Sequence, residues 1–178
     1  SQDGYAYAVN AATGAQIWAS AKLGDVLQAG PAGLFSDFRP GAPNLVYVGT
    51  RNATLPNKVY ALSPATGAVV GTPFDNGGGT SAIGIITGIT VDYATNYVYF
   101  TSRAAGGGSS HTLWCLDGTS PTLAKVWSLA VGDVDGSPVL YQGRLYVGTN
   151  SGQVRAVDAT TRQIVWTYPA SAGSDGPV

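Results

Sequence analysis

The fold is decided by the segment Tyr7-Ala8-Val9-Asn10, which is followed by Ala-Ala-Thr-Gly, three further residues and Trp18. The segment returns as Arg155-Ala156-Val157-Asp158, followed by Ala-Thr-Thr-Arg, three residues and Trp166. The step from Ala to Trp is ten residues in both copies. A supersecondary unit repeated along a chain cannot bury its apolar face alone, so it stacks on its neighbours. The repeat therefore predicts an array of similar units.

Two degenerate copies lie between these two. Tyr60-Ala61-Leu62-Ser63 leads to Gly67 but has Gly71 where the Trp would stand. Trp114-Cys115-Leu116-Asp117 reaches Trp127 after two extra residues. Four related segments therefore divide the chain.

The last unit shows what each repeat contains. Four extended runs alternate with short turns, at residues 137–141, 144–149, 153–158 and 163–168. This pattern predicts an antiparallel meander of four strands, here called A, B, C and D. Strand B recurs at 45–50 and 97–102, and strand A recurs around 31–34 and 85–91. All ten acidic residues are Asp, Met is absent and there are 25 Gly, so strong helix formers are scarce and turn formers are plentiful.

Four-stranded units in series favour an all-β propeller with radially arranged blades. We expect a single propeller segment over residues 1–178. Its predicted parts are strands C and D of a first blade (1–28), three further blades (29–74, 84–130 and 135–169) and the start of another blade (174–178).

The motif A-x-[D/N]-x-x-x-G-x-x-x-W resembles the tryptophan-docking repeat of the pyrroloquinoline-quinone-type (PQQ-like) propellers. Ala8, Asn10, Gly14 and Trp18 match it fully, and the last copy has Arg162 in place of Gly. The resemblance covers essentially the whole chain. It implies the fold but not one function, because the repeat occurs in quinoprotein dehydrogenases and in non-enzymatic scaffolds such as an outer-membrane assembly lipoprotein.

The Trp residues are predicted to pack between blades rather than to stack on a ligand. A large flat ring on strand D can approach the small residue of a neighbouring strand C, and such a contact is mostly packing energy. We expect Trp18, Trp127 and Trp166 to dock in this way. Replacing Trp166 by Ala should then lower the free energy of unfolding by about 3–5 kcal/mol.

The alignment of repeats runs from the end of a strand B to the opening of a fifth strand A. Two interpretations follow. The chain is either a fragment of a propeller with about seven or eight blades, as the resemblance implies, or four units that close on themselves or pair with a second copy. The fragment is favoured here, and its unpaired strand edges are expected to be covered by something else.

Composition argues against several functions. The net charge is −1 and charged residues make up 11%, without a basic stripe, so nucleic acid is not an expected partner. No run of 18 apolar residues exists, so we expect no membrane insertion. Few charges and many Gly, Ser, Thr and Asn suit an extracellular, periplasmic or cell-envelope protein.

Candidate chemistry is sparse. His111 is the single histidine, and Cys115 stands at the small-residue position of strand C. Asp133-Val134-Asp135-Gly136 begins like a calcium loop but lacks the later ligands, so a turn with capping Asp side chains is favoured. The glycine-rich stretches at 77–80 and 106–110 carry no phosphate-loop Lys. No catalytic, cofactor-binding or metal-binding residue is assigned, and no cofactor is expected.

The predicted function is a non-enzymatic binding or scaffold module. The alternative is a fragment of a PQQ-dependent dehydrogenase, which by resemblance would need calcium, a Trp floor, a catalytic Asp and often adjacent cysteines. The long B–C and D–A connections share one end of a propeller. A protein partner is therefore expected at loops 51–58, 72–84 and 103–112 or at the open blade edges, with a homo-oligomer or larger assembly as the result.

Overall fold

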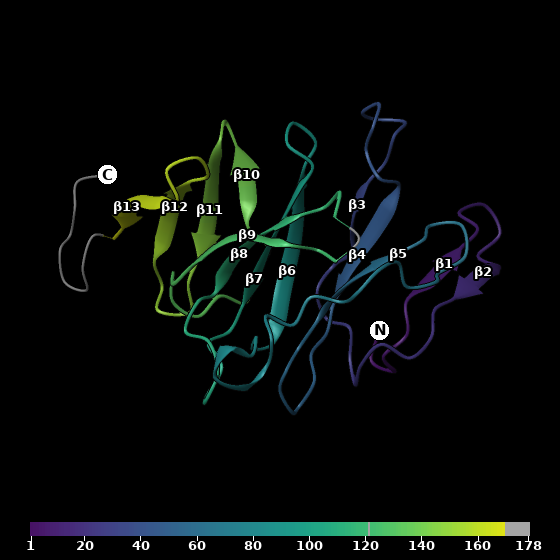
Figure 1. Cartoon of the computed structure of the whole chain (residues 1–178), viewed down its shortest axis with the longest axis horizontal. Helices are drawn as coiled ribbons and strands as arrows, with labels where there is room; N and C mark the ends of the chain where they lie inside the picture. Colours follow the sequence, from purple (N-terminus) through teal and green to yellow (C-terminus); the bar gives the residue numbers. More distant parts are fainter. Residues whose placement is uncertain (121, 170–178) are drawn as a thin grey trace.

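The computed structural model of the chain describes residues 1–120 and 122–169. These residues form four antiparallel sheets in chain order (Figure 1). The first sheet contains β1 (Tyr7–Val9) and β2 (Gln16–Ala19). The second contains β3 (Ala32–Leu34), β4 (Leu45–Gly49) and β5 (Val59–Leu62). The third contains β6 (Ile86–Asp92), β7 (Tyr97–Ser102), β8 (Leu113–Asp117) and β9 (Lys125–Leu129). The fourth contains β10 (Val139–Tyr141), β11 (Arg144–Gly148), β12 (Val154–Asp158) and β13 (Gln163–Tyr168).

Each sheet is a meander in which consecutive strands pair, as the sequence predicts for an all-β propeller. The sheets lie side by side along the longest axis, so β1–β2 and β13 stand at opposite ends (Figure 1). The described residues therefore form an open arc, and they do not close a four-unit ring. The predicted start of another blade at 174–178 lies outside the described residues.

The second sheet lacks a regular strand D. After β5, the chain makes only two isolated bridges, Leu62 with Val69 and Val59 with Phe74. Gly71 and Pro73 interrupt this stretch, and proline has no N–H to give to a ladder. The loss of the fourth strand thus coincides with the repeat that lacks its Trp.

The turn between strands C and D explains the polar and glycine positions of the repeat. The Asn10 carboxamide oxygen accepts the N–H groups of Ala12 (2.9 Å) and Thr13 (3.0 Å). The Asp158 carboxylate does the same for Thr160 (2.9 Å) and Thr161 (2.7 Å). Four residues later, the backbone needs a positive φ, which is 71° at Gly14, 73° at Gly67 and 63° at Arg162. Arg162 keeps the glycine conformation without being a glycine.

Strand D bulges immediately before each Trp of the repeat. Ala8 pairs with Trp18 while Val9 pairs with Gln16, so Ile17 is the extra residue. Val126 and Val165 occupy the same place before Trp127 and Trp166. A bulge re-aims the neighbouring side chain, so each Trp leaves its strand in the same direction.

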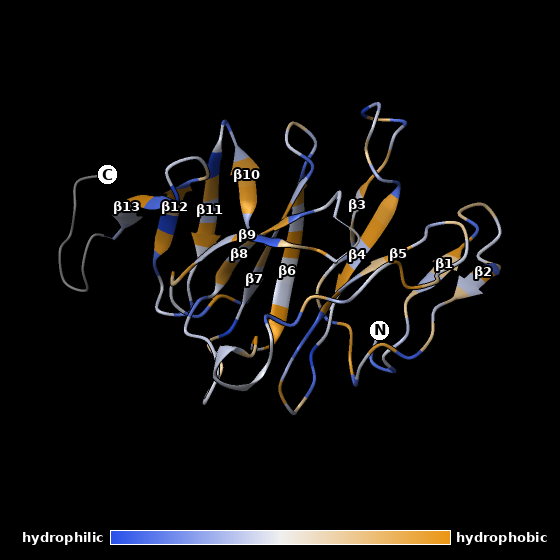
Figure 2. Cartoon of the chain, viewed as in Figure 1, coloured by the Kyte–Doolittle hydropathy of each residue, from blue (hydrophilic) through white to orange (hydrophobic). Residues whose placement is uncertain are grey.

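The apolar core lies between successive sheets. Strands carry most of the apolar residues and the connecting turns carry most of the polar ones (Figure 2). Between the second and third sheets, Trp114 stacks on Phe100 with ring centroids 5.6 Å apart and planes 2° apart. Tyr47 is fully buried there and donates its hydroxyl to the carbonyl of Gly118 at 3.0 Å. The described part has one short 3-10 helix, Gly79–Ser81, and none of its helices is suited to spanning a membrane.

Candidate binding surfaces

Trp18 docks between the first and second sheets, as predicted. Its indole Nε1 donates to the carbonyl of Pro64 at 2.8 Å. Its ring lies against Gly67, where an added Cβ would overlap the six-membered ring. The docking receptor is therefore a C–D turn with a glycine and an outward-facing carbonyl.

Trp127 is also buried, with 7% of its surface exposed, in the cluster between the third and fourth sheets. Its ring centroid lies 5.9 Å from that of Tyr99. The C–D turn of the fourth sheet carries Arg162 in place of the receptor glycine. The predicted packing role of Trp127 is confirmed.

The prediction that Trp166 docks between blades is wrong for the described residues. Its ring is 40% exposed and contacts Tyr146 of its own sheet, with centroids 5.9 Å apart. The reason is that no described sheet follows β13. The expected loss of about 3–5 kcal/mol on replacing Trp166 by Ala therefore does not apply to a single copy, because that range belongs to fully buried aromatics.

The predicted binding loops do come together at one end of the molecule, at the lower edge of Figure 1. We call residues 51–58, 72–84 and 103–112 the loop end. The backbone N–H of Asn57 donates to the carbonyl of Ile83 at 3.0 Å, and the backbone N–H of Ser109 donates to the carbonyl of Ala82 at 2.9 Å. The buried Asn57 side chain accepts from the Thr50 hydroxyl at 3.2 Å and shapes the first loop. The loop 72–84 is therefore hydrogen-bonded to both of the other loops.

Carboxylates near the loop end serve contacts between adjacent repeats. Arg103 forms a bidentate pair with Asp135, at 2.6 and 2.7 Å. This pairing lowers the pKa of Asp135 and raises that of Arg103. The Ala104 amide donates to Asp133 at 2.6 Å, and Ala53 donates to Asp25 at 3.2 Å. Asp133 and Asp135 thus bond to the loop that follows β7 and to Asn150, rather than capping their own turn as the sequence predicts.

His111 and Cys115 do not meet. His111 is exposed, and its Nδ1 lies 2.7 Å from the Ser128 hydroxyl. Cys115 is fully buried in the cluster between the third and fourth sheets, as its place in the repeat predicts. Burial raises the pKa of its thiol to about 12.

Cys115 should resist alkylation in the native protein. At pH 8 a thiol with a pKa of about 12 is almost entirely protonated, and the thiolate is the nucleophile. We expect iodoacetamide to label the chain only after denaturation, as measured by intact mass. Cys115→Ala should keep the native melting temperature within a few degrees, because Ala occupies the same position in the other repeats. Rapid native labelling would show that this core opens readily.

A cleft of about 640 Å³, which no sequence pattern indicates, lies at the end opposite the loop end. It lies between the third and fourth sheets, beside Trp127, where the turns at 92–97, 141–143 and 159–162 meet. Asp92, Thr95 and Arg162 add polar groups to an aromatic wall that includes Tyr97. Its volume falls in the range of small-molecule sites. The residues that line the cleft come from two separate repeats, so no single sequence motif predicts it.

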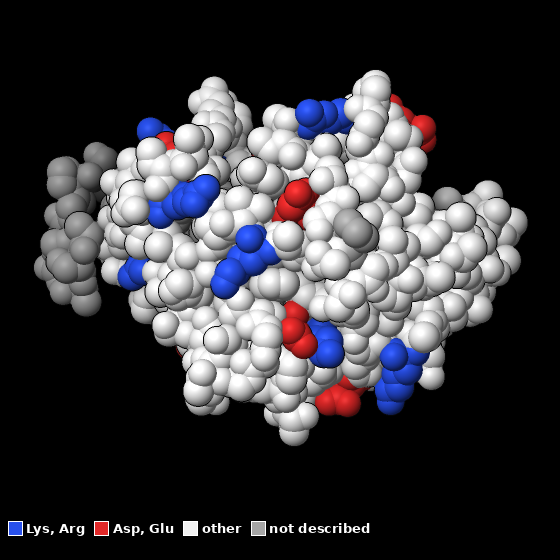
Figure 3. Space-filling model, viewed as in Figure 1, with Lys and Arg blue, Asp and Glu red and all other residues white. Residues whose placement is uncertain are grey.

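The described residues do not fit a quinone site with calcium. No three of the His, Cys and Asp side chains in the part of the chain that the structure describes lie close enough together to hold an ion. Trp18 packs on the second sheet, and Trp127 packs in the cluster between the third and fourth sheets and also lines the cleft. Charged side chains are also sparse on the face shown in Figure 3.

Comparison with known proteins identifies the repeat. A family model described as outer membrane protein assembly factor BamB, of the PQQ-like repeat type, matches residues 2–72 and 57–178. No curated protein matches the chain.

Three solved structures share the fold. BamB from Moraxella catarrhalis is 24% identical with a TM-score of 0.54, and the alignment covers 94% of this chain and 47% of that one. The computationally designed Ika8 protein is 15% identical with a TM-score of 0.62, over 96% and 45%. Sqt1 from Saccharomyces cerevisiae is 14% identical with a TM-score of 0.64, over 94% and 42%. The chain thus spans about half the length of these propeller chains.

Proposed function

Because the chain belongs to the PQQ-like repeat family described as outer membrane protein assembly factor BamB, we propose that it is a non-enzymatic binding or scaffold module of a cell-envelope propeller. The observation that carries this proposal is that polar side chains near the loop end make structural contacts between repeats. Those near the loop end bond neighbouring repeats, as Arg103 bonds Asp135, and no three His, Cys or Asp side chains of the described residues gather as a metal-binding group. Reaction chemistry needs converging groups, whereas a binding surface does not.

The loop end is the proposed surface for a protein partner. Its three loops come from successive units of a rigid scaffold, an arrangement in which binding residues commonly occur. Leu55 offers an exposed apolar side chain there, with 41% of its surface accessible. Lys58 and Asp75 form a half-exposed pair at 3.7 Å and add both signs of charge to the loop end. A partner with an apolar residue within a polar rim fits this surface.

Site-specific photo-crosslinking in cell-envelope extracts would test this proposal. A crosslinking residue at position 55 should capture a protein, whereas one at position 38 should not. Phe38 is the matched control because it is 76% exposed and lies in the β3–β4 hairpin at the opposite end (Figure 1). Capture from position 38 alone would overturn the assignment of the loop end.

The alternative function as part of a quinoprotein dehydrogenase has a separate test. The chain is mixed with pyrroloquinoline quinone and calcium, and dye reduction by alcohols is measured. We expect neither a shifted quinone spectrum nor alcohol-dependent reduction. Both together would overturn the non-enzymatic proposal.

A further inference from the structure

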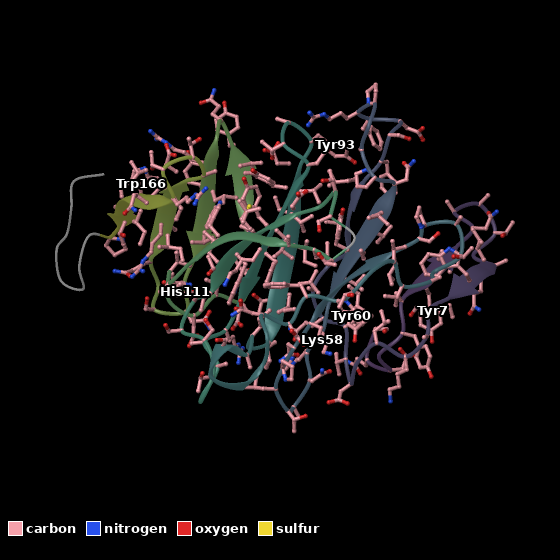
Figure 4. All side chains as sticks on the ribbon, viewed as in Figure 1. Tyr7, Lys58, Tyr60, Tyr93, His111 and Trp166 are labelled. Carbon is pink, nitrogen blue, oxygen red and sulfur yellow. The ribbon has the colours of Figure 1, made fainter. Side chains whose placement is uncertain are left out.

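The cleft beside Trp127 is a junction between two sheets that each have four strands among the described residues. The turn 92–97 borders it. Tyr93 of that turn lies near the upper edge of the molecule, whereas Lys58 of the loop end lies in the lower half (Figure 4). The cleft is therefore a surface separate from the loop end.

Arg162 explains why this junction is open. At the junction between the first and second sheets, the ring of Trp18 lies within 2.4 Å of the place that a Cβ at Gly67 would take. Arg162 is the equivalent of Gly67, because both have a positive φ (63° and 73°). In both, the backbone N–H donates to the carbonyl four residues earlier at 2.8 Å. Since Arg162 carries a Cβ, Trp127 cannot rest on its turn in the same way.

The hydrogen bonds at the two junctions differ accordingly. Trp18 Nε1 donates to the carbonyl of Pro64 at 2.8 Å. The residue equivalent to Pro64 in the fourth sheet is Ala159, which lines the cleft. Within residues 1–120 and 122–169, the indole N–H of Trp127 makes no hydrogen bond to Ala159 or to any other residue. The cleft thus lies where the other junction has its contact between Trp and turn.

The guanidinium of Arg162 lies toward the cleft. Arg162 lines it, and its charge acts on Cys115, which is buried in the cluster between the same two sheets. Burial raises the pKa of the Cys115 thiol, whereas a hydrogen bond with Tyr99 and the charge of Arg162 oppose that rise. No carboxylate of the described residues forms an ion pair with this guanidinium. The cleft therefore contains a planar cation that can donate several hydrogen bonds.

The one acidic side chain that lines the cleft, Asp92, is already bonded within its own turn. It accepts the backbone N–H of Ala94 at 2.7 Å and the hydroxyl of Thr95 at 2.7 Å. Asp92 thus leaves the donors of Arg162 for a ligand, and its negative charge opposes a ligand with two carboxylates. A single carboxylate fits this balance of charge.

The rest of the cleft suits an apolar body. Tyr97, Val126 and Leu140 are half-buried and line it beside Trp127. Tyr97 meets Tyr99 edge-on, with ring centroids 6.3 Å apart, so the aromatic wall is continuous. Sites of this kind bury the body of a small ligand against aromatic side chains, and a few polar groups fix its orientation.

We propose that this cleft binds a small monocarboxylate with an apolar or aromatic body. The carboxylate pairs with the guanidinium of Arg162, in the bidentate geometry that this pair favours. The body lies against Tyr97 and Trp127. The replacement of the receptor glycine by Arg162 thus supplies both the space and the charge. This inference does not depend on the proposed partner surface, because the loop end contributes no residue to the cleft.

Titration with 3-phenylpropionate, followed by NMR of the tryptophan indole N–H groups, would test the inference. The chain has four Trp, and the signal that disappears in Trp127→Phe is that of Trp127. This signal should shift until the site is saturated, while the signal of Trp18 should stay in place. The alcohol 3-phenylpropanol has the same body without the charge, and it should bind at least about tenfold more weakly.

Two substitutions at position 162 separate the charge from the space. Arg162→Gln should weaken binding of 3-phenylpropionate by about tenfold or more. Arg162→Gly restores the receptor glycine and keeps the fold, because glycine adopts a positive φ readily. It should abolish binding and slow the solvent exchange of the Trp127 indole N–H, which can then bond to Ala159. Arg144→Gln is the matched control, since Arg144 is exposed on the same sheet and does not line the cleft.

Several results would overturn the proposal. One is a Trp127 signal that does not move at millimolar 3-phenylpropionate, and another is equal binding of the acid and the alcohol. Unchanged affinity in Arg162→Gln, or an equal loss in Arg144→Gln, would show that Arg162 does not hold the carboxylate.

Discussion

Replacing Trp114 by Ala should lower the free energy of unfolding by about 3–5 kcal/mol, the range for a fully buried large aromatic. Trp114 has no exposed surface, stacks on Phe100 and meets Phe74 edge-on at 6.2 Å. Its indole Nε1 donates to the Ser102 hydroxyl at 3.0 Å, so the truncation also leaves that buried hydroxyl without this donor. Urea unfolding followed by tyrosine fluorescence and circular dichroism would measure the loss.

The matched control uses the other extreme of tryptophan burial. Trp166→Ala should cost no more than about 1 kcal/mol, because 40% of the surface of that residue is exposed. Equal losses at the two positions would mean that Trp166 is buried within a single copy.

Gly88→Ala should destabilise the chain by about 1–3 kcal/mol through overpacking. A Cβ at position 88 would overlap the backbone of Ser137, at the entry to the fourth sheet. That backbone cannot retreat freely, because the Thr101 hydroxyl donates to Gly136 at 2.6 Å and the Thr87 hydroxyl donates to Val134 at 2.8 Å. The substitution therefore separates the third and fourth sheets.

Gly106→Ala is the control for this substitution, because its Cβ would have nothing within 4 Å and its φ is not in the left-handed region. Thermal unfolding monitored by circular dichroism should show a lower midpoint for Gly88→Ala only. An unchanged midpoint for Gly88→Ala would show that the contact between β6 and the 134–137 segment is loose.

The repeat was sufficient to predict the sheets because each of its positions has a local physical reason. Asn10 and Asp158 cap a turn, and Gly14 and Gly67 supply its positive φ. The bulges before Trp18, Trp127 and Trp166 were not predicted, because one extra residue leaves no mark on the pattern of apolar residues. The fate of Trp166 was predicted wrongly, because the sequence specifies a docking residue but not the presence of its receptor.

The loop end and the cleft were predictable to a smaller extent. Strand order alone places the loops 51–58, 72–84 and 103–112 at one end, because alternate connections of a meander share an end. The cleft beside Trp127 could not be predicted, because it depends on how turns from two sheets approach each other. The buried hydrogen bond from Tyr47 to Gly118 is equally invisible in the sequence, since the two residues are 71 positions apart.

The hydrogen bond from Trp18 to Pro64 also determines when the first repeat can complete its packing during synthesis on the ribosome. Its partners are 46 residues apart, so the hairpin β1–β2 emerges long before the turn that receives its ring. A two-stranded hairpin on its own is at best marginally stable in water. During synthesis the indole of Trp18 therefore stays exposed until the turn that contains Pro64 has left the exit tunnel. Trp127 is subject to the same delay, because the fourth sheet that covers it is synthesised later, whereas the second repeat has no Trp to be covered.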